Sequence, residues 1–252
     1  MATQDDHRLA RDLAQEAGQL LLRLRDQLLA EGVTGKELGA RGDAAAHALL
    51  VGRLATERPD DAVLSEEATN VEHADLSRLA ADRVWIIDPV DGTREYGEAR
   101  SDWAVHVALV ENHMPTAGAV ALPGLPLVLS TDDPPALAPA VDPPRVVVSR
   151  SRPPAVAQQI ADALAAELIA MGSAGAKAMA VVRGEAEIYP HSGGQYEWDS
   201  CAPVAVAAAA GLHVSRIDGS PLAYNQADVY LPDLLICRPE LAPAAIAAVT
   251  DS

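Results

Sequence analysis

Phenylalanine is absent from this sequence of 252 residues, and aromatic residues together make up only 3% of it. Hydrophobic residues nevertheless account for 49%, so the core must be built from alanine, valine, leucine and isoleucine. This hydrophobic content excludes an intrinsically disordered chain. At about 100–200 residues per domain, the length fits one large domain or two small ones, and either can bury a substantial core.

Basic residues are also scarce, because 19 lysines and arginines face 36 aspartates and glutamates and leave a formal net charge of −17. A polymeric nucleic acid needs a basic surface, so the composition argues against such a partner. It does not exclude a small phosphorylated ligand, since one local cationic pocket can hold it despite the global field.

Long apolar runs and closely spaced cysteine or histidine pairs are missing too. The apolar stretches are shorter than the about 20 residues of a membrane span, and the polar start, MATQDDHRLARD, has no signal-peptide core. Cys201 and Cys237 lack zinc-like spacing, which predicts a reduced, cytoplasmic protein. No paired spacing links the histidines, which favours surface or core positions over metal ligation for His7, His47, His73, His106, His113 and His213.

Hydrophobic periodicity divides the chain into two parts. Helices are predicted over 8–30 and 44–58, the second preceded by Asp43. The runs AVLSEE and VWIID predict strands that end in acid, and 103–131 predicts two or three antiparallel strands. Later strands are predicted at 145–151, 185–191 and 233–238, and later helices at 151–171, 174–184, 202–211 and 239–250.

A segment rich in proline and aspartate, 131–145, separates these parts. It predicts an N-terminal α+β part, residues 1–143, with two long helices on an antiparallel sheet. The remaining residues, 144–252, alternate strand and helix and predict a mixed α/β part.

Charged residues concentrate in VWIIDPVDGT, residues 84–93, where an apolar run ends in two aspartates. Pro89 forces a stiff turn, so Asp88 and Asp91 can face one pocket together with the backbone carbonyl of Val90. Crowded oxygen donors suit a hard dication such as Mg²⁺. An isolated DPxDG is equally typical of a strand-end turn followed by a helix cap.

More acid follows other predicted elements. Glu66 and Glu67 close the strand AVLSEE, and Asp199 precedes a helix at its N-terminal end. Each is also typical of a structural role, as a solvated helix start or an N-cap. Gly92 and Thr93, which come directly after Asp91, offer backbone N–H groups that can cradle an anion at a helix start.

Taken together, LSEE, WIIDPVDGTREY, GSAGAK and EWDSCAPVAVAAAAG resemble the inositol monophosphatase superfamily over residues 43–226. The resemblance implies Mg²⁺-dependent, lithium-sensitive phosphomonoesterases with a layered αβαβα fold. The turn DGTREY, the strand VVVSRSR and the segment GSAGAK are most similar to the CysQ branch, the 3′(2′),5′-bisphosphate nucleotidases of sulfate assimilation. The family is also compatible with a homodimer.

The resemblance implies roles for single residues. Two or three Mg²⁺ ions would be held by Glu66, Asp88, the Val90 carbonyl, Asp91 and Asp199. Catalysis would involve Thr93 as the water-activating hydroxyl, oriented by Asp43, with Glu67 ordering water. Substrate contacts are expected from Gly92, Thr93, Arg94, Ser149, Arg150, Ser173 and Lys177.

Three departures from the family pattern stand out. Its Thr-x-x-Asp before the second helix is replaced by GARGD, with Gly39 or Ala40 near the threonine position. GSAGAK is one residue longer than the Gly-Ser-Ser-x-Lys of some relatives, and His191 stands where relatives often carry arginine. If that arginine contacts the second phosphate or the base, selectivity is loosened in this chain.

The predicted reaction is therefore hydrolysis of 3′-phosphoadenosine 5′-phosphate to AMP, of its sulfated relative to adenylyl sulfate, or of both. The alternatives are a phosphatase for inositol monophosphate or fructose 1,6-bisphosphate, and a non-catalytic metal- or nucleotide-sensing relative. An aspartyl-phosphate phosphatase would need Asp-x-Asp, which the spacing of Asp88 and Asp91 does not provide.

Overall fold

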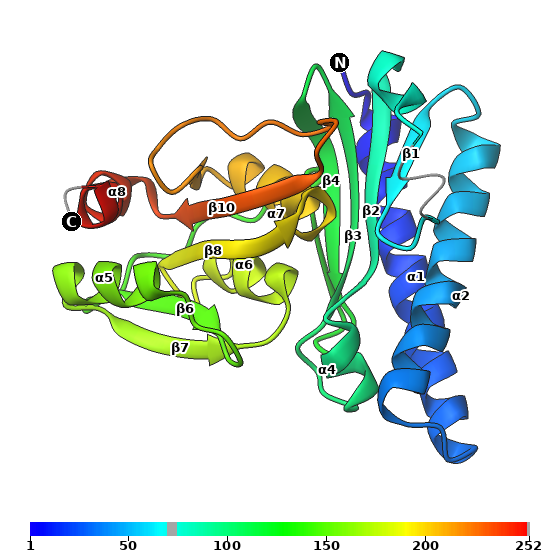
Figure 1. Cartoon of the computed structure of the whole chain (residues 1–252), viewed down its shortest axis with the longest axis horizontal. Coiled ribbons are helices and arrows are strands. Elements are labelled where there is room, and N and C mark those ends of the chain that lie inside the picture. The colour runs from blue at the N-terminus through cyan, green and yellow to red at the C-terminus, as the bar shows by residue number, and fades with distance from the viewer. Residues whose placement is uncertain (70–74, 251–252) are drawn as a thin grey trace.

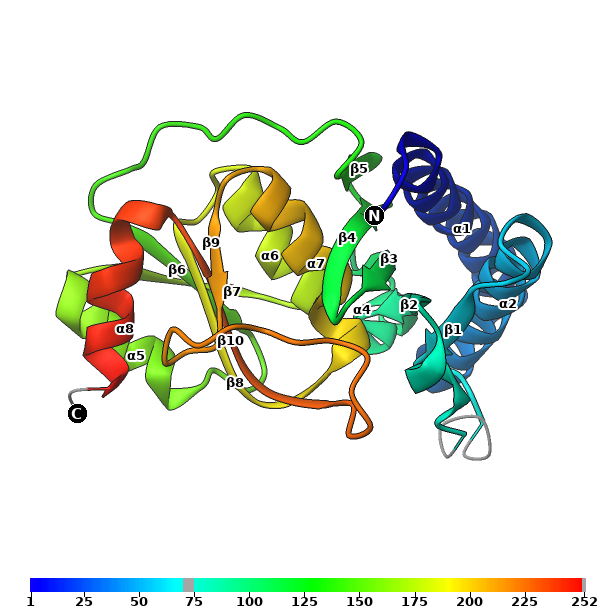
Figure 2. The same cartoon turned by 90° about the horizontal axis from the view of Figure 1, so that it is seen from above.

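The computed structural model describes residues 1–69 and 75–250, so His73 lies outside the described residues. Two five-stranded sheets and the helices around them form five layers in the order helix, sheet, helix, sheet, helix (Figure 1, Figure 2). This arrangement confirms the predicted αβαβα fold class. None of the described helices is both long and apolar enough to cross a membrane.

The first sheet has the strand order β1-β2-β3-β4-β5. Its β1–β2 pair is parallel and the other pairs are antiparallel. The sheet is therefore mixed, and the prediction of an antiparallel sheet is wrong for this pair. The short helices η1 and α4 flank β2 in the sequence. The bounds are β1 Ala62–Ser65, η1 Ser77–Ala80, β2 Arg83–Asp91, α4 Thr93–Gly97, β3 Ala104–Glu111, β4 Met114–Leu122 and β5 Leu127–Ser130.

Two long helices cover the outer face of this sheet, α1 (Gln4–Ala30) and α2 (Gly35–Glu57). The predicted start of the second helix after Asp43 is wrong, because Asp43 lies inside α2. Gly39 and Gly42 disfavour a helix intrinsically, but tertiary packing selects them. A Cβ on Gly42 would lie 2.7 Å from the Tyr96 ring, so α2 can approach α4 only where it carries glycine.

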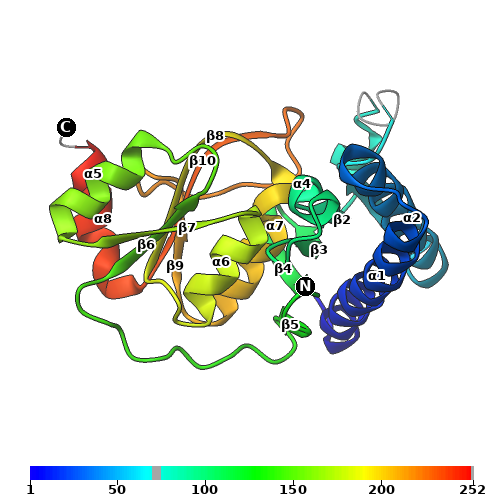
Figure 3. The same cartoon turned by 90° about the horizontal axis from the view of Figure 1, so that it is seen from below.

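The middle layer consists of α6 (Ala174–Val182) and α7 (Glu197–Ala209), which lie between the two sheets (Figure 3). Small side chains allow α7 to sit close to β4, since a Cβ on Gly118 would lie 2.9 Å from the Cβ of Ala205. The helix predicted over 202–211 begins earlier, at Glu197, and this places Asp199 in its first turn.

The second sheet has the order β7-β6-β8-β10-β9, with α5 and α8 on its outer face (Figure 2). The single helix predicted over 151–171 is wrong. The observed helix, α5, ends at Leu164, and the next residue, Ala165, adopts a left-handed conformation. Residues 167–171 then form a strand that pairs in parallel with β6. The bounds are β6 Arg145–Ser149, α5 Ala155–Leu164, β7 Glu167–Met171, β8 Ile188–Tyr196, β9 His213–Ser215, β10 Tyr230–Cys237, η2 Pro239–Leu241 and α8 Ala242–Thr250.

Residues 131–144 connect the two sheets without a helix or strand and run along the edge of the molecule (Figure 3). The predicted division into parts 1–143 and 144–252 falls in this segment and stays a prediction.

An ion-pair network joins α1, β2 and β3 at one end of the first sheet. The Arg83 guanidinium donates to Asp6 at 2.9 Å and to Asp61 at 2.9 Å, and it lies 3.3 Å from Glu111. The Asp6 side chain is only 3% exposed. Although desolvation opposes the shift, hydrogen bonds from Thr3 and Arg83 lower the pKa of Asp6 below its ordinary value of 3.8.

We therefore expect Arg83→Met to lower the free energy of unfolding by about 2 kcal/mol at pH 7, because it removes charged hydrogen bonds from a buried carboxylate. Since the folded pKa of Asp6 is depressed, its stabilising effect exists above pH 3.8 and is lost as the pH falls further. In urea unfolding, the difference in free energy of unfolding between Arg83→Met and the unmodified chain should be smaller at pH 3 than at pH 7. The exposed Arg23→Met serves as control, and an equal loss in both variants would contradict the role of the network.

Candidate active site

One extra residue in β2 decides where its two aspartates point. From Asp88, paired with His106, to Asp91, paired with Ala104, β2 advances three residues and β3 only two. In a regular strand, residues three apart point to opposite faces of the sheet. The bulge, which contains Pro89, cancels this alternation, so both carboxylates lie on the face of the sheet that packs against the middle helix layer, α6 and α7.

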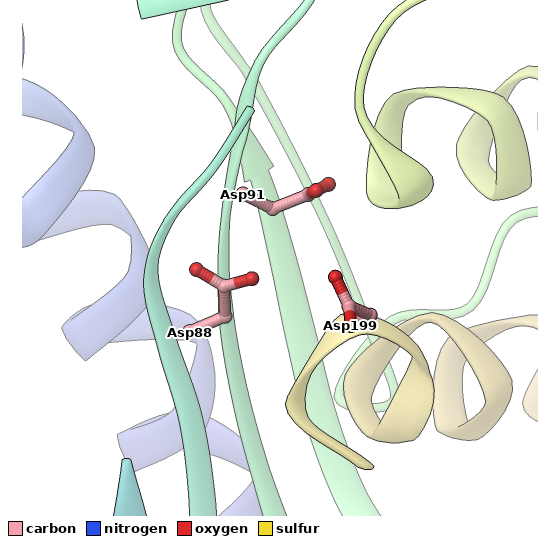
Figure 4. A group of neighbouring side chains, drawn as sticks. All are labelled: Asp88, Asp91 and Asp199. Atoms are coloured by element: carbon pink, nitrogen blue, oxygen red, sulfur yellow. The ribbon is translucent and has the colours of Figure 1, made fainter. Parts of the chain in front are cut away.

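Asp199 completes a cluster of three carboxylates that we call the acidic cluster (Figure 4). One oxygen from each of Asp88, Asp91 and Asp199 lies within 4.8 Å of the others. The Tyr196 backbone N–H donates to the Asp199 carboxylate at 2.7 Å, which holds it at the first turn of α7. The structure thus brings together three of the predicted metal ligands from two distant parts of the chain.

Burial and repulsion affect the three carboxylates differently. Desolvation raises the pKa of Asp88 well above its ordinary value, and nearby carboxylates raise it further. Desolvation also raises the pKa of Asp199 to about 6, and the charge of Asp91 adds to this shift. Desolvation acts in the same direction on Asp91, but His106 and Ser173 outweigh it and hold the Asp91 pKa at about 2. Asp91 is therefore the member that stays anionic most readily.

The start of α6 supplies the hydrogen bonds that stabilise Asp91 as an anion. The Ser173 hydroxyl donates to its carboxylate, as do the backbone N–H groups of Ala174 at 3.0 Å and Gly175 at 2.6 Å. Ser173 has a φ of 52°, an unusual value for a residue with a side chain. Strain of this kind persists where the surroundings enforce it, as they do at this junction between the two sheets.

Glu66 and Glu67 follow β1 in a turn and do not close the strand as predicted. Desolvation raises the pKa of Glu66 to about 7, with the charge of Asp199 as the next cause. Although the residue as a whole is exposed, its carboxyl group lies against the acidic cluster, because it forms a side-chain hydrogen bond with Asp88. Glu66 is outside the group whose oxygens lie within 4.8 Å.

Thr93, at the start of α4, and Asp43, in α2, lie close together. The Thr93 hydroxyl lies 3.1 Å from the Val90 carbonyl oxygen and 3.5 Å from the Asp43 carboxylate. Desolvation raises the pKa of Asp43 to about 8, and the charge of Glu67 adds to the shift. Gly39 permits this approach, because a Cβ there would lie 2.7 Å from Thr93 Cγ2.

Gly92 links the acidic cluster to α4. Its φ of 89° lies in the left-handed region, which glycine adopts without steric cost. A Cβ there would also come within 3.2 Å of the Ser173 side chain, so the chain reverses in a confined space.

A cavity of about 470 Å³ opens beside Asp91 and Asp199. The predicted substrate-binding residues that line it are Gly92, Arg94, Ser149, Ser173 and Lys177. Arg150 is not among its lining residues; its guanidinium pairs with Asp102 and lies 3.7 Å from Glu95. A second cavity shares Arg94 and is lined by Asp43, Glu67 and Thr93.

Lys177 is the buried cation of the first cavity. Its ammonium group donates to the Ser173 carbonyl and lies 5.4 Å from the centre of the Tyr189 ring. Desolvation lowers the Lys177 pKa, while nearby carboxylates, Asp91 foremost, oppose the shift. The cavity thus joins a buried positive charge to the acidic cluster.

Arg152 and His106 are among the residues that sequence reasoning did not connect with this site. Arg152 lines the cavity. His106 is fully buried, with its Nε2 3.3 Å from an Asp91 oxygen. The alternation of side chains along β3 predicts that His106 shares a face with Asp88 only if the register between β2 and β3 is already known.

Comparison with known proteins settles the family. The model of the inositol monophosphatase family matches residues 4–133 and 142–252. The chain belongs to this family.

Several family members are similar along most of their length. A protein of Mycobacterium tuberculosis (strain CDC 1551 / Oshkosh) named 3′-phosphoadenosine 5′-phosphate phosphatase is 52% identical over 247 residues, covering 94% of this chain and 90% of that protein. The 3′(2′),5′-bisphosphate nucleotidase CysQ of Escherichia coli K12 is 30% identical, covering 87% and 94%. The crystal structure of CysQ from Bacteroides thetaiotaomicron matches with a TM-score of 0.78 at 28% identity, covering 93% and 97%.

The residues of the acidic cluster could hold a metal ion, which fits this metal-dependent phosphatase family. Carboxylate oxygens are hard donors that suit hard dications. The raised pKa values of Asp88 and Asp199 show that this donor set lacks positive charge, which a bound dication would supply.

We expect Asp43→Asn to make the metal-free chain less sensitive to pH. The pKa of Asp43 is raised from 3.8 to about 8 in the folded state, so the folded chain holds a proton that the unfolded chain releases. Its contribution to stability is therefore full below pH 3.8 and falls as the pH rises toward 8. Urea unfolding in EDTA at pH 5 and pH 8 should show a smaller decline for Asp43→Asn. The exposed Asp82→Asn is the control, and an unchanged decline in Asp43→Asn would refute the assignment.

Proposed function

We propose that the chain hydrolyses the 3′-phosphate of 3′-phosphoadenosine 5′-phosphate to give AMP, and that of its sulfated relative to give adenylyl sulfate, in sulfate assimilation. The acidic cluster beside a cavity with a buried lysine carries the proposal. The 52% identity to a protein named for the first of these reactions supports the choice of substrate. The buried free cysteines, Cys201 and Cys237, are compatible with a cytoplasmic location.

The proposed cofactor is Mg²⁺, with two or three ions per site. Asp88, Asp91 and Asp199 would hold it, together with Glu66 and the Val90 carbonyl. When bound, it would supply positive charge to the phosphoryl oxygens and to the departing oxygen.

The protein side of the reaction is proton handling. A water oxygen forms a bond to phosphorus and gives up one proton, while the bond from phosphorus to the 3′-oxygen breaks and that oxygen leaves as a hydroxyl after taking one proton from solvent. Thr93 would accept a hydrogen bond from the attacking water and direct its own proton toward Asp43. A pKa of about 8 places Asp43 close to the range in which a base works at neutral pH. Glu67, on the same cavity, would order the water.

Positive charge in the first cavity would hold the rest of the substrate. Lys177 is buried beside Ser173, and Ser149 and Arg94 line the same space. An ammonium group with little water around it binds a phosphate more strongly than a solvated one. We therefore assign the second phosphate of the nucleotide to this end of the cavity.

One observation favours a second candidate, a phosphatase for inositol monophosphate or fructose 1,6-bisphosphate. Arg150, a predicted nucleotide contact, is paired with Asp102 and close to Glu95. With this cation engaged, less positive charge remains for a nucleotide phosphate.

A substrate panel separates these functions. We expect phosphate release from 3′-phosphoadenosine 5′-phosphate with a kcat/KM at least about tenfold above that for inositol 1-phosphate and fructose 1,6-bisphosphate. The assay measures inorganic phosphate with Mg²⁺ and, as control, with EDTA. Preference for a sugar phosphate would support the second candidate, and no release from any substrate would indicate a non-catalytic relative.

Thr93→Ala should lower kcat about a hundredfold, because the hydroxyl that orients the attacking water is lost. KM should change little, since the effect falls on the transition state. Thr93→Ser keeps the hydroxyl and should retain most of the activity. A large rise in KM with unchanged kcat in Thr93→Ala would argue for a binding role instead.

A further inference from the structure

His106 lies beside the acidic cluster, with one ring nitrogen 3.3 Å from an Asp91 oxygen and the other 4.0 Å from an Asp88 oxygen. It lies on β3 opposite Asp88 and is 0% exposed. A fully buried imidazole beside carboxylates is held there by its surroundings, because burial of a polar ring carries a cost in free energy unless it is partnered.

The two ring nitrogens of His106 contact two different elements. Nδ1 lies 3.0 Å from the Trp198 carbonyl oxygen, and because a carbonyl only accepts, Nδ1 donates. Nε2 lies 3.3 Å from Oδ2 of Asp91, although the two atoms do not form a regular hydrogen bond. The ring thus spans from β2 to the residue that precedes Asp199.

Gly175 provides an independent sign that this ring position is built into the fold. A Cβ on Gly175 would lie 2.1 Å from His106 Nε2, so only glycine leaves room for the ring. The Gly175 backbone N–H donates to Oδ2 of Asp91, the same oxygen that Nε2 faces. Ring and glycine therefore confine one carboxylate oxygen from two sides.

We infer that His106 is a positioning residue, which together with Gly175 fixes the orientation of Asp91 and its spacing from Asp199 and so sets the metal affinity of the acidic cluster. Groups that orient metal ligands typically change affinity by about 10- to 100-fold when they are removed. The inference rests on the metal-binding part of the proposed function.

Two variants separate the two ring contacts. The amide of His106→Gln can reach the position of Nε2, and the amide of His106→Asn can reach only that of Nδ1. Mg²⁺ affinity is measured by calorimetry on the full chain without substrate. We expect at least about tenfold weaker binding in His106→Asn and a change of less than about threefold in His106→Gln.

Gly175→Ala provides a second line, because it keeps the imidazole but displaces it from Asp91; we expect weaker Mg²⁺ binding here too. His213→Asn, on β9 in the second sheet, is the matched control and should bind as the unmodified chain does. Circular dichroism in EDTA establishes which variants fold.

Unchanged Mg²⁺ affinity in a folded His106→Asn would overturn the inference, and so would an equal loss in the Gln and Asn variants. If His106→Asn does not fold, Gly175→Ala decides, and unchanged affinity there overturns the inference. Phosphate release by the unmodified chain tests the proposed function separately. An unmodified chain that binds no Mg²⁺ would refute both.

Discussion

Repulsion between carboxylates that share one buried space is the constraint on which the rest of the structure depends. In a medium of low dielectric, like charges at such distances oppose folding strongly. Desolvation raises the pKa of Asp88 and of Asp199, and repulsion from the neighbouring carboxylates adds to both shifts. A sequence selected for stability alone would not gather these groups. The surrounding bulge, turn and helix starts are therefore best understood as devices that hold the carboxylates together until a cation offsets their charge.

Asp91 shows how this constraint shapes the fold. It ends a strand of the first sheet, yet its hydrogen bonds come from the start of α6, in the second half of the chain. Asp199 reaches the same space from α7. Both helices lie between the sheets, so the acidic cluster belongs to the contact between the two halves (Figure 1). The hydrogen bonds that position Asp91 therefore also connect the first sheet to α6, which packs between the two sheets.

Hydrophobic periodicity predicted two long helices on a sheet, followed by alternating strands and helices, because periodicity is a local signal. The layered αβαβα fold followed from the family resemblance that the acidic motifs and their order carry. The predicted start of α2 was wrong because Gly39 and Gly42 pack against Thr93 and Tyr96, and the predicted end of α5 was wrong because the residues that follow it pair with β6. Tertiary contacts override local propensity at both places. At the site, the aspartates could be named from their motifs, but the bulge that aligns them depends on register with β3. The place of His106 could not be foreseen, because it follows from that register and from the absence of a side chain at Gly175.

The charge of the chain raises a last question, since a protein with a formal net charge of −17 is proposed to bind an anion with two phosphates. Screening limits the reach of surface carboxylates to about 8 Å at physiological ionic strength, so the cavity decides the outcome. Lys177 supplies one buried positive charge there, but Asp91 and Asp199 are its neighbours and oppose an anion. Bound cations would reverse that sign. We therefore expect a filled acidic cluster to favour substrate entry as well as the chemical step, so a residue that changes metal affinity would also change substrate binding.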